Sequence, residues 1–194
     1  PIRTVLTLFA IVSFMGIPYT VLMPVFATRI LHGGAHTLGF LMGASGVGSL
    51  ISALVLTARK SVRGLYRVLP AVAGLFGGGL IGFSFSHSFW LSLALMVVTG
   101  FGMMQFASGS NMVIQTIVEE DKRARVMSYW ITAYIGASPF GSLLAGSLAP
   151  AGGAPGTVLL CGAGCLAGAA WFSFQIPELR PVSRKRGGRD GDAI

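Results

Sequence analysis

The chain has 194 residues, of which 53% are hydrophobic and 10% are charged, with a mean hydropathy of +0.75 and a net charge of +8. A soluble domain carries about a quarter charged residues because its surface faces water, so this composition excludes an ordinary soluble protein and indicates an integral membrane protein. The positive charge does not indicate nucleic acid, because the basic residues lie in short segments between apolar stretches, where anionic lipid headgroups are the expected partner.

Six apolar stretches have the length of a membrane-spanning helix, which needs roughly 20 residues. They cover residues 4–27, 38–58, 68–85, 89–118, 126–149 and 157–176. We therefore predict an all-α membrane protein with a six-helix transmembrane domain over residues 1–176. Residues 177–194 are polar and rich in Gly and Arg, which predicts a basic, disordered tail. The chain begins with Pro1 and shows no signal-peptide pattern, so we expect a fragment of a longer protein.

The basic residues are divided unequally between the two sides of the predicted bundle. One side holds 13 of the 14 Lys and Arg residues, at Arg3, in the loops around residues 59–67 and 122–125, and in the tail. The other side holds Arg29 together with all three histidines. Because Lys and Arg concentrate in cytoplasmic loops, we predict a multi-pass protein of a bacterial inner membrane with both termini in the cytoplasm.

The first span, residues 4–27, is interrupted by Pro18 and Pro24, and Met15, Tyr19 and Met23 share one of its faces. Helix breaks at membrane depth are tolerated where the freed carbonyls face protein or a water-filled cavity. The pattern fits either a flexible, cavity-lining helix with an adaptable Met/Tyr face or a kinked packing helix, and the sequence leaves both interpretations open.

Small residues in the second and third spans predict close contacts between helices. In the second span they form pairs at four-residue spacing, and in the third span they repeat along one face: Gly39/Gly43, Gly48/Ser52, then Gly74, Gly78 and Gly82.

The fourth span, residues 89–118, is the most polar. Gln105, Ser108, Asn111 and Gln115 fall within about a third of the helix circumference. Amides in lipid need hydrogen-bond partners on a neighbouring helix or on a substrate. We favour interhelical bonds for Asn111 and Gln115, and substrate contact for Gln105, which lies nearer the middle of the span.

The fifth span, residues 126–149, combines flexibility with aromatic surface. A proline flanked by glycines, within residues 136–141, allows this helix to bend and pack closely. Upstream, Tyr129, Trp130 and Tyr134 either line a pocket or anchor the helix at the membrane interface.

The spans contain no chemistry typical of catalysis. All six acidic residues lie outside them, and no Lys or Arg lies deep within one, so we predict no proton relay, catalytic residue or cofactor, and no enzyme activity. His32 and His36 have a ligand-like spacing, but the two glycines between them disfavour a helix, so we predict an external loop and no metal site. We interpret Cys161 and Cys165 as small packing residues.

The segment after the fourth span carries a family resemblance. It reads Asn111-x3-Gln115-x3-Glu119-Glu120-Asp121-Lys122-Arg123-Ala124-Arg125-Val126-Met127-Ser128. It resembles the stretch between helices ten and eleven in the major facilitator superfamily, specifically the drug and siderophore exporters that include the enterobactin exporter. Residues 136–146 resemble that family's helix eleven, and the Pro18-Tyr19 and Met23-Pro24 pairs its helix seven. The resemblance covers nearly the whole chain, as helices seven to twelve.

The family resemblance implies alternating access, in which two six-helix halves rock around a central site. The first, second, fourth and fifth spans would face that site, where we expect substrate contacts from Tyr19, Met23, Gln105, Asn111 and Tyr134. A second set of residues, in the loop between the fourth and fifth spans, would act in gating, or alternatively only form a solvated loop: Glu119, Asp121, Arg123 and Arg125.

This chain departs from the family in the loop between the second and third spans, where residues 57–64 lack the family's acidic residue, so a charge latch there is not expected. The predicted function is efflux of a small apolar or amphipathic compound, with any proton-coupling carboxylate in a missing N-terminal half. The alternatives are a six-helix scaffold or accessory subunit without transport activity, and, third, a membrane-embedded enzyme.

Overall fold

The computed structural model describes residues 2–16, 18–58, 65–118 and 120–187. Its regular elements are all helical, which confirms the predicted all-α class. In chain order they are α1 (Ile2–Gly16), α2 (Tyr19–Val25), the π-helical η1 (Phe26–Ile30), α3 (Ala35–Ala58), α4 (Leu65–Phe85), α5 (Phe89–Ile117), α6 (Glu120–Ile131), the π-helical η2 (Thr132–Gly136) and α7 (Ala137–Gly187).

Five helical segments of the described chain are long and apolar enough to cross a membrane, and they correspond to five of the six predicted spans. These segments are Thr4–Ile30, Ala35–Ala58, Arg67–Phe85, Phe89–Thr116 and Gly152–Gln175. The remaining predicted span, 126–149, is also helical, through α6, η2 and the beginning of α7. Its serine, threonine and tyrosine residues make it less apolar than the other five.

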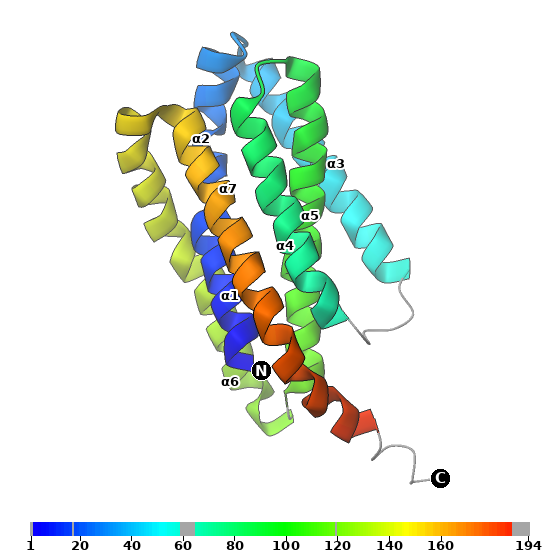
Figure 1. Ribbon diagram of the computed structural model, residues 1–194. Helices are drawn as coiled ribbons and strands as arrows, with labels where there is room; N and C mark the ends of the chain where they lie inside the picture. The colour runs from blue at the N-terminus through cyan, green and yellow to red at the C-terminus, as the bar shows by residue number, and fades with distance from the viewer. Residues whose placement is uncertain (1, 17, 59–64, 119, 188–194) are drawn as a thin grey trace.

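The long helices run up and down one bundle (Figure 1). α7 reverses direction at Gly153, whose φ of 72° lies in the left-handed region that favours glycine. We call residues 137–152 its first limb and residues 154–187 its second limb. The second limb continues as helix past the predicted domain boundary at residue 176, and the division into a domain and a tail stays a prediction.

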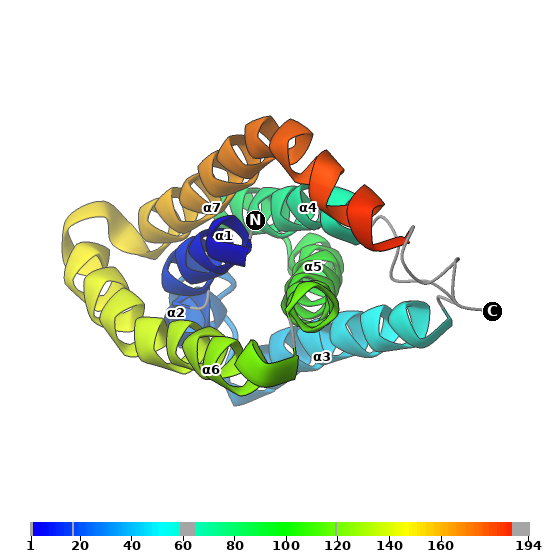
Figure 2. The same ribbon diagram turned by 90° about the horizontal axis from the view of Figure 1, so that it is seen from below.

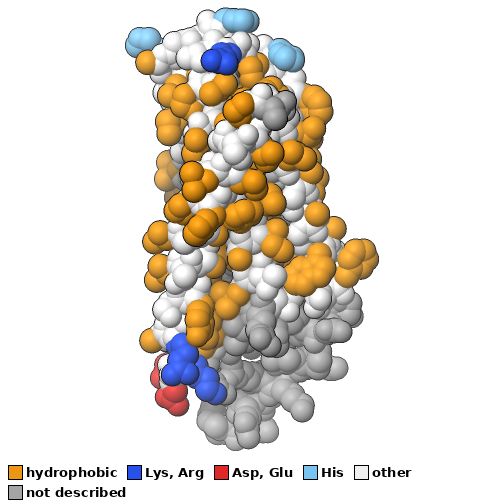
Figure 3. All heavy atoms as spheres, turned by 90° about the vertical axis from the view of Figure 1, so that its left-hand side faces the viewer, with side chains coloured by type: hydrophobic (Ala, Val, Ile, Leu, Met, Phe, Trp, Pro, Cys, Tyr) orange, Lys and Arg blue, Asp and Glu red, His pale blue; other side chains and the backbone are white. Residues whose placement is uncertain are grey.

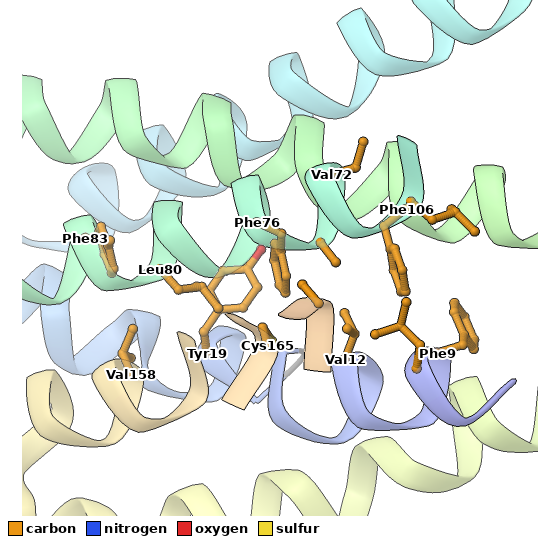
Figure 4. Packing of buried hydrophobic residues seen from close by; sticks show 14 of the residues in the cluster. Phe9, Val12, Tyr19, Val72, Phe76, Leu80, Phe83, Phe106, Val158 and Cys165 are labelled. Carbon is orange, nitrogen blue, oxygen red and sulfur yellow. The ribbon is translucent and has the colours of Figure 1, made fainter. Parts of the chain in front are cut away.

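The bundle has a back and a front when seen along its length (Figure 2). α4 and the second limb of α7 lie side by side at the back, α1 and α5 lie in the middle, and α6 and α3 flank the front. The buried side chains of α1, α2, α4, α5 and α7 form most of the core (Figure 4), where Tyr19, Phe76 and Cys165 meet near its centre. α4 and the second limb of α7, which correspond to the third and sixth predicted spans, thus lie together on one side of the bundle.

Glycines permit the closest helix crossings. A Cβ at Gly48 would overlap the Val97 carbonyl oxygen, and a Cβ at Gly100 would overlap that of Ser45, so α3 and α5 touch backbone to backbone. At the crossing of α4 with α7, a Cβ at Gly77 or Gly162 would lie 2.8 Å from the other residue's carbonyl oxygen.

The prediction from small-residue spacing is only partly right. Gly48 and Ser52 pack against α5 as expected, but Gly39, Gly43 and Gly78 have open space around them. Gly74 and Gly82 have side-chain neighbours, Leu166 and Leu95, rather than a backbone contact. The spacing identified the helix faces that are lined by small residues. It did not identify which of these faces contacts another helix of this chain.

The surface of the bundle has three zones (Figure 3). Histidines and Arg29 lie at one end, which we call the histidine end, and the charged residues Arg67, Asp121, Lys122, Arg123 and Arg125 lie at the other, which we call the basic end. The belt between them exposes large apolar side chains, among them Phe40, Leu50, Leu54, Trp90 and Leu143. Because such a belt is unfavourable in water and favourable in hydrocarbon, it is the surface that a lipid bilayer covers.

Candidate substrate-facing surface

The first membrane segment places its two predicted site residues in the interior. Tyr19 begins α2 just after the helix break that Pro18 accompanies, and its hydroxyl lies 3.5 Å from the Ser45 hydroxyl of α3. The Tyr19 ring meets Phe76 edge-on, with ring centroids 6.1 Å apart. Met23 is also buried. The segment therefore has an interrupted helix and also packs against its neighbours, so both interpretations of its prolines describe part of it. A substrate-contacting role for Tyr19 and Met23 stays a prediction.

The Gln105 side chain, predicted to contact substrate, is buried and forms an interhelical bond. Its carbonyl oxygen accepts a 2.8 Å hydrogen bond from the Ser52 hydroxyl of α3, and it is only 3% exposed. One turn away, the Ser49 hydroxyl donates a 3.2 Å hydrogen bond to the Gly100 carbonyl oxygen. These polar contacts lie beside the glycine crossing and join α3 to α5.

The other amides of α5 lie on an open face, which we call the α5 polar stripe (Ser108, Asn111 and Gln115). The Gln115 amide donates a hydrogen bond to the Asn111 side-chain oxygen, so in the described chain these two amides bond along their own helix. The Ser108 hydroxyl donates a weak hydrogen bond to the sulfur of Met104, one turn earlier on the same helix, at 3.8 Å. Interhelical bonding was expected for Asn111 and Gln115, but the structure shows it for Gln105 instead.

Four aromatic rings meet where α1, α5, α6 and η2 come together; we call them the aromatic cluster (Phe9, Phe106, Trp130 and Tyr134). Phe9 stacks on all three of the others, with ring centroids 5.8 Å from Phe106, 4.8 Å from Trp130 and 5.7 Å from Tyr134. Phe9 and Phe106 are buried, whereas Trp130 and Tyr134 are half-buried. Tyr134, a predicted site residue, thus belongs to a packed group whose central member, Phe9, the sequence did not single out.

The predicted gating residues lie on the first turns of α6 at the basic end. Arg123 forms an ion pair with Glu120, with an N–O distance of 3.7 Å, and both side chains are exposed. Asp121 and Arg125 are exposed as well, and Glu119 lies outside the described residues. The acid that pairs with Arg123 is therefore Glu120, three residues earlier, a spacing that is visible in the sequence once the helix is known to begin there.

The α5 polar stripe and the aromatic cluster carry only neutral side chains. Among the described residues no group of three or more His, Cys, Asp and Glu is placed to hold a metal ion. Amides and hydroxyls can exchange hydrogen bonds with a bound molecule, and the aromatic and methionine side chains offer apolar and stacking contacts. Such a surface can bind and release a compound through these contacts.

A comparison with known protein families decides the identity of this bundle. The family model of the Major Facilitator Superfamily matches residues 5–192, nearly the whole chain. The chain belongs to this superfamily. The major facilitator chain is also 29% identical over 130 residues to the Staphyloferrin A transporter of Staphylococcus aureus (strain NCTC 8325 / PS 47). That alignment covers 66% of this chain and 32% of the relative's length. No solved structure matches the chain.

Proposed function

We propose that this chain is the C-terminal six-helix half, helices seven to twelve, of a secondary transporter that exports a small apolar or amphipathic compound by alternating access. Two findings support the proposal. The chain belongs to the superfamily, and it is similar to a transporter that is about three times longer than the aligned stretch. The missing half would supply the opposite wall of the cavity and any carboxylate that couples export to protons. The cell membrane, with both termini in the cytoplasm, would be its location.

The α5 polar stripe is the observation that carries this proposal. Asn111 and Gln115 lie within or at the end of a membrane-spanning helix, yet they bond to each other and to no neighbouring helix of the described chain. Exposing amides to hydrocarbon costs free energy, so we expect this face to meet a water-filled cavity, a substrate or the second half. Gln105 is engaged by Ser52, which makes Asn111 the better candidate for substrate contact.

The charged turn of α6 would act in gating. Asp121, Arg123 and Arg125 are exposed at the basic end, and they follow the α5 polar stripe in the sequence. In an alternating-access cycle, charge pairs between the two halves favour one gate state over the other. Exposed groups suit that role because they can exchange partners as the halves move.

Ethidium, an amphipathic cation, provides a direct test in the full-length native protein. We expect energised everted vesicles, whose cytoplasmic face is outside, to accumulate ethidium. Asn111→Ala should slow its initial uptake about fivefold to tenfold, the loss expected from one hydrogen bond of about 1 to 1.4 kcal/mol. The matched control is Ser173→Ala, an exposed serine on the second limb of α7 that bonds only its own helix. Accumulation only in right-side-out vesicles would exclude efflux, and no uptake in either orientation across a panel of amphipathic dyes would exclude the proposed transport.

A further inference from the structure

Two buried polar atoms in the described chain have no hydrogen-bond partner, and both belong to residues placed near Phe9 by stacking or by helix position. They are the hydroxyl oxygen of Ser13 and the indole nitrogen of Trp130. Ser13 lies one helical turn after Phe9 on α1, and the Trp130 ring stacks on Phe9 with centroids 4.8 Å apart. Leaving a donor buried and unsatisfied costs free energy, so each such group in a folded protein requires an explanation.

The rings around these atoms share one orientation. The planes of Phe106, Trp130 and Tyr134 lie within 22°, 19° and 27° of the Phe9 plane, and those of Trp130 and Tyr134 lie within 11° of each other. Trp130 and Tyr134 are half-buried, so part of each side chain is accessible from outside the cluster, whereas Phe9 and Phe106 are enclosed. Near-parallel rings from several segments form a platform on which a further planar group can stack.

We infer that the aromatic cluster is a binding site for a planar aromatic group that carries a hydrogen-bond acceptor, with the Trp130 indole N–H as the donor to that acceptor. An indole nitrogen can only donate, so a carbonyl or similar oxygen on the ligand satisfies it. The half-buried rings provide the stacking surface, and Ser13 provides a second polar contact along α1. This site rests on the proposed transport function for its biological role, but it differs from the α5 polar stripe in residues and in ligand chemistry.

The structure also indicates how such a ligand enters. The indole nitrogen is enclosed although its ring is half-buried, so α6 must shift for an acceptor to reach it. The π-helical η2 begins two residues after Trp130 and separates α6 from the first limb of α7. Such segments are common bending points and are frequent at functional sites. The first limb, by contrast, is held close to α1 at Gly141, where a Cβ would overlap the Phe14 carbonyl oxygen.

A matched pair of probes tests this assignment: 9-fluorenone, which is planar and has one carbonyl acceptor, and fluorene, which lacks the carbonyl. Equilibrium binding of each tritiated compound is measured on the full-length native protein in lipid nanodiscs, with empty nanodiscs as background. We expect 9-fluorenone to bind more tightly than fluorene. Trp130→Phe, which keeps a ring but loses the N–H, should weaken 9-fluorenone about fivefold to tenfold and leave fluorene unchanged.

The control variant is Trp90→Phe, which removes an indole N–H from a residue that is 78% exposed near the histidine end, and which should bind both probes like the native protein. Equal affinity for the two probes, or 9-fluorenone binding that is insensitive to Trp130→Phe, would overturn the site. Because binding requires no transport cycle, an absence of transport across the whole dye panel together with Trp130-dependent binding would refute the proposed function and leave the site standing.

Discussion

The Ser52 hydroxyl donates a 2.8 Å hydrogen bond to the side-chain oxygen of Gln105, and both side chains are buried where α3 crosses α5. Between membrane helices such a bond contributes modestly, about 0.6 kcal/mol on average and at most about 1.7 kcal/mol, because the unfolded chain in the membrane also finds partners. Replacing only one of the two side chains lowers the stability by more than this, because the remaining polar group stays buried without its partner.

A double-mutant cycle of Ser52→Ala and Gln105→Leu should therefore show a coupling free energy of about 0.6 to 1.7 kcal/mol. The free energy of unfolding is measured by SDS titration of the protein in mixed micelles. We expect the double variant to be less destabilised than the sum of the single variants, because it leaves no unpaired amide at this crossing. Strictly additive effects would show that the two side chains do not act as a pair.

The all-α class and five of the six apolar membrane spans were predictable from this sequence, but the orientation of each helix face was not. In a membrane helix both the lipid-facing and the protein-facing sides are apolar, so Gly39 and Gly48 look equivalent in the pattern, although only Gly48 meets a neighbouring backbone. Gln105 and Asn111 were assigned to one face, yet that face is wide enough for Gln105 to reach α3 while Asn111 stays open.

The aromatic cluster shows a second limit of the sequence. Trp130 and Tyr134 stood out because they are large and close together, but Phe9 is separated from them by most of the chain and resembles any other apolar residue of its span. Only packing brings it between them. The π-helical segments were equally hidden, because a single widened turn leaves no periodic pattern in the residues.

The backbone contact between α3 and α5 should make Gly100 intolerant of even a methyl group. In Gly100→Ala the new Cβ would overlap the Ser45 carbonyl oxygen, and since a backbone atom cannot rotate away, the helices must separate. We expect a loss of about 1 to 3 kcal/mol, the usual range for overpacking, seen as a lower midpoint of thermal unfolding in detergent. Gly46→Ala is the matched control, because Gly46 has open space around it. A similar midpoint for both variants would contradict the close crossing.

The turn in α7 should depend on Gly153 for a different reason, its backbone conformation. With φ at 72°, a residue with a side chain is strained there, so Gly153→Ala should cost about 1 kcal/mol or more. Gly152→Ala provides the comparison, since Gly152 has open surroundings and no positive φ. The two free energies of unfolding are compared by the same SDS titration. If Gly152→Ala lowers the free energy of unfolding as much as Gly153→Ala does, backbone strain at residue 153 is not the cause of the destabilisation.

The ion pair between Glu120 and Arg123 should contribute little to stability, whatever its role in gating. The two groups are 3.7 Å apart and exposed at the basic end, where solvent and salt screen the attraction. We expect Arg123→Gln with Arg125→Gln to leave the thermal midpoint unchanged and to slow ethidium export by the full-length protein, because the lost charges would act between the two halves rather than within this one. Arg29→Gln, at the histidine end, should leave both quantities unchanged. A drop in the midpoint that parallels the loss of export would instead assign these arginines to the stability of the fold.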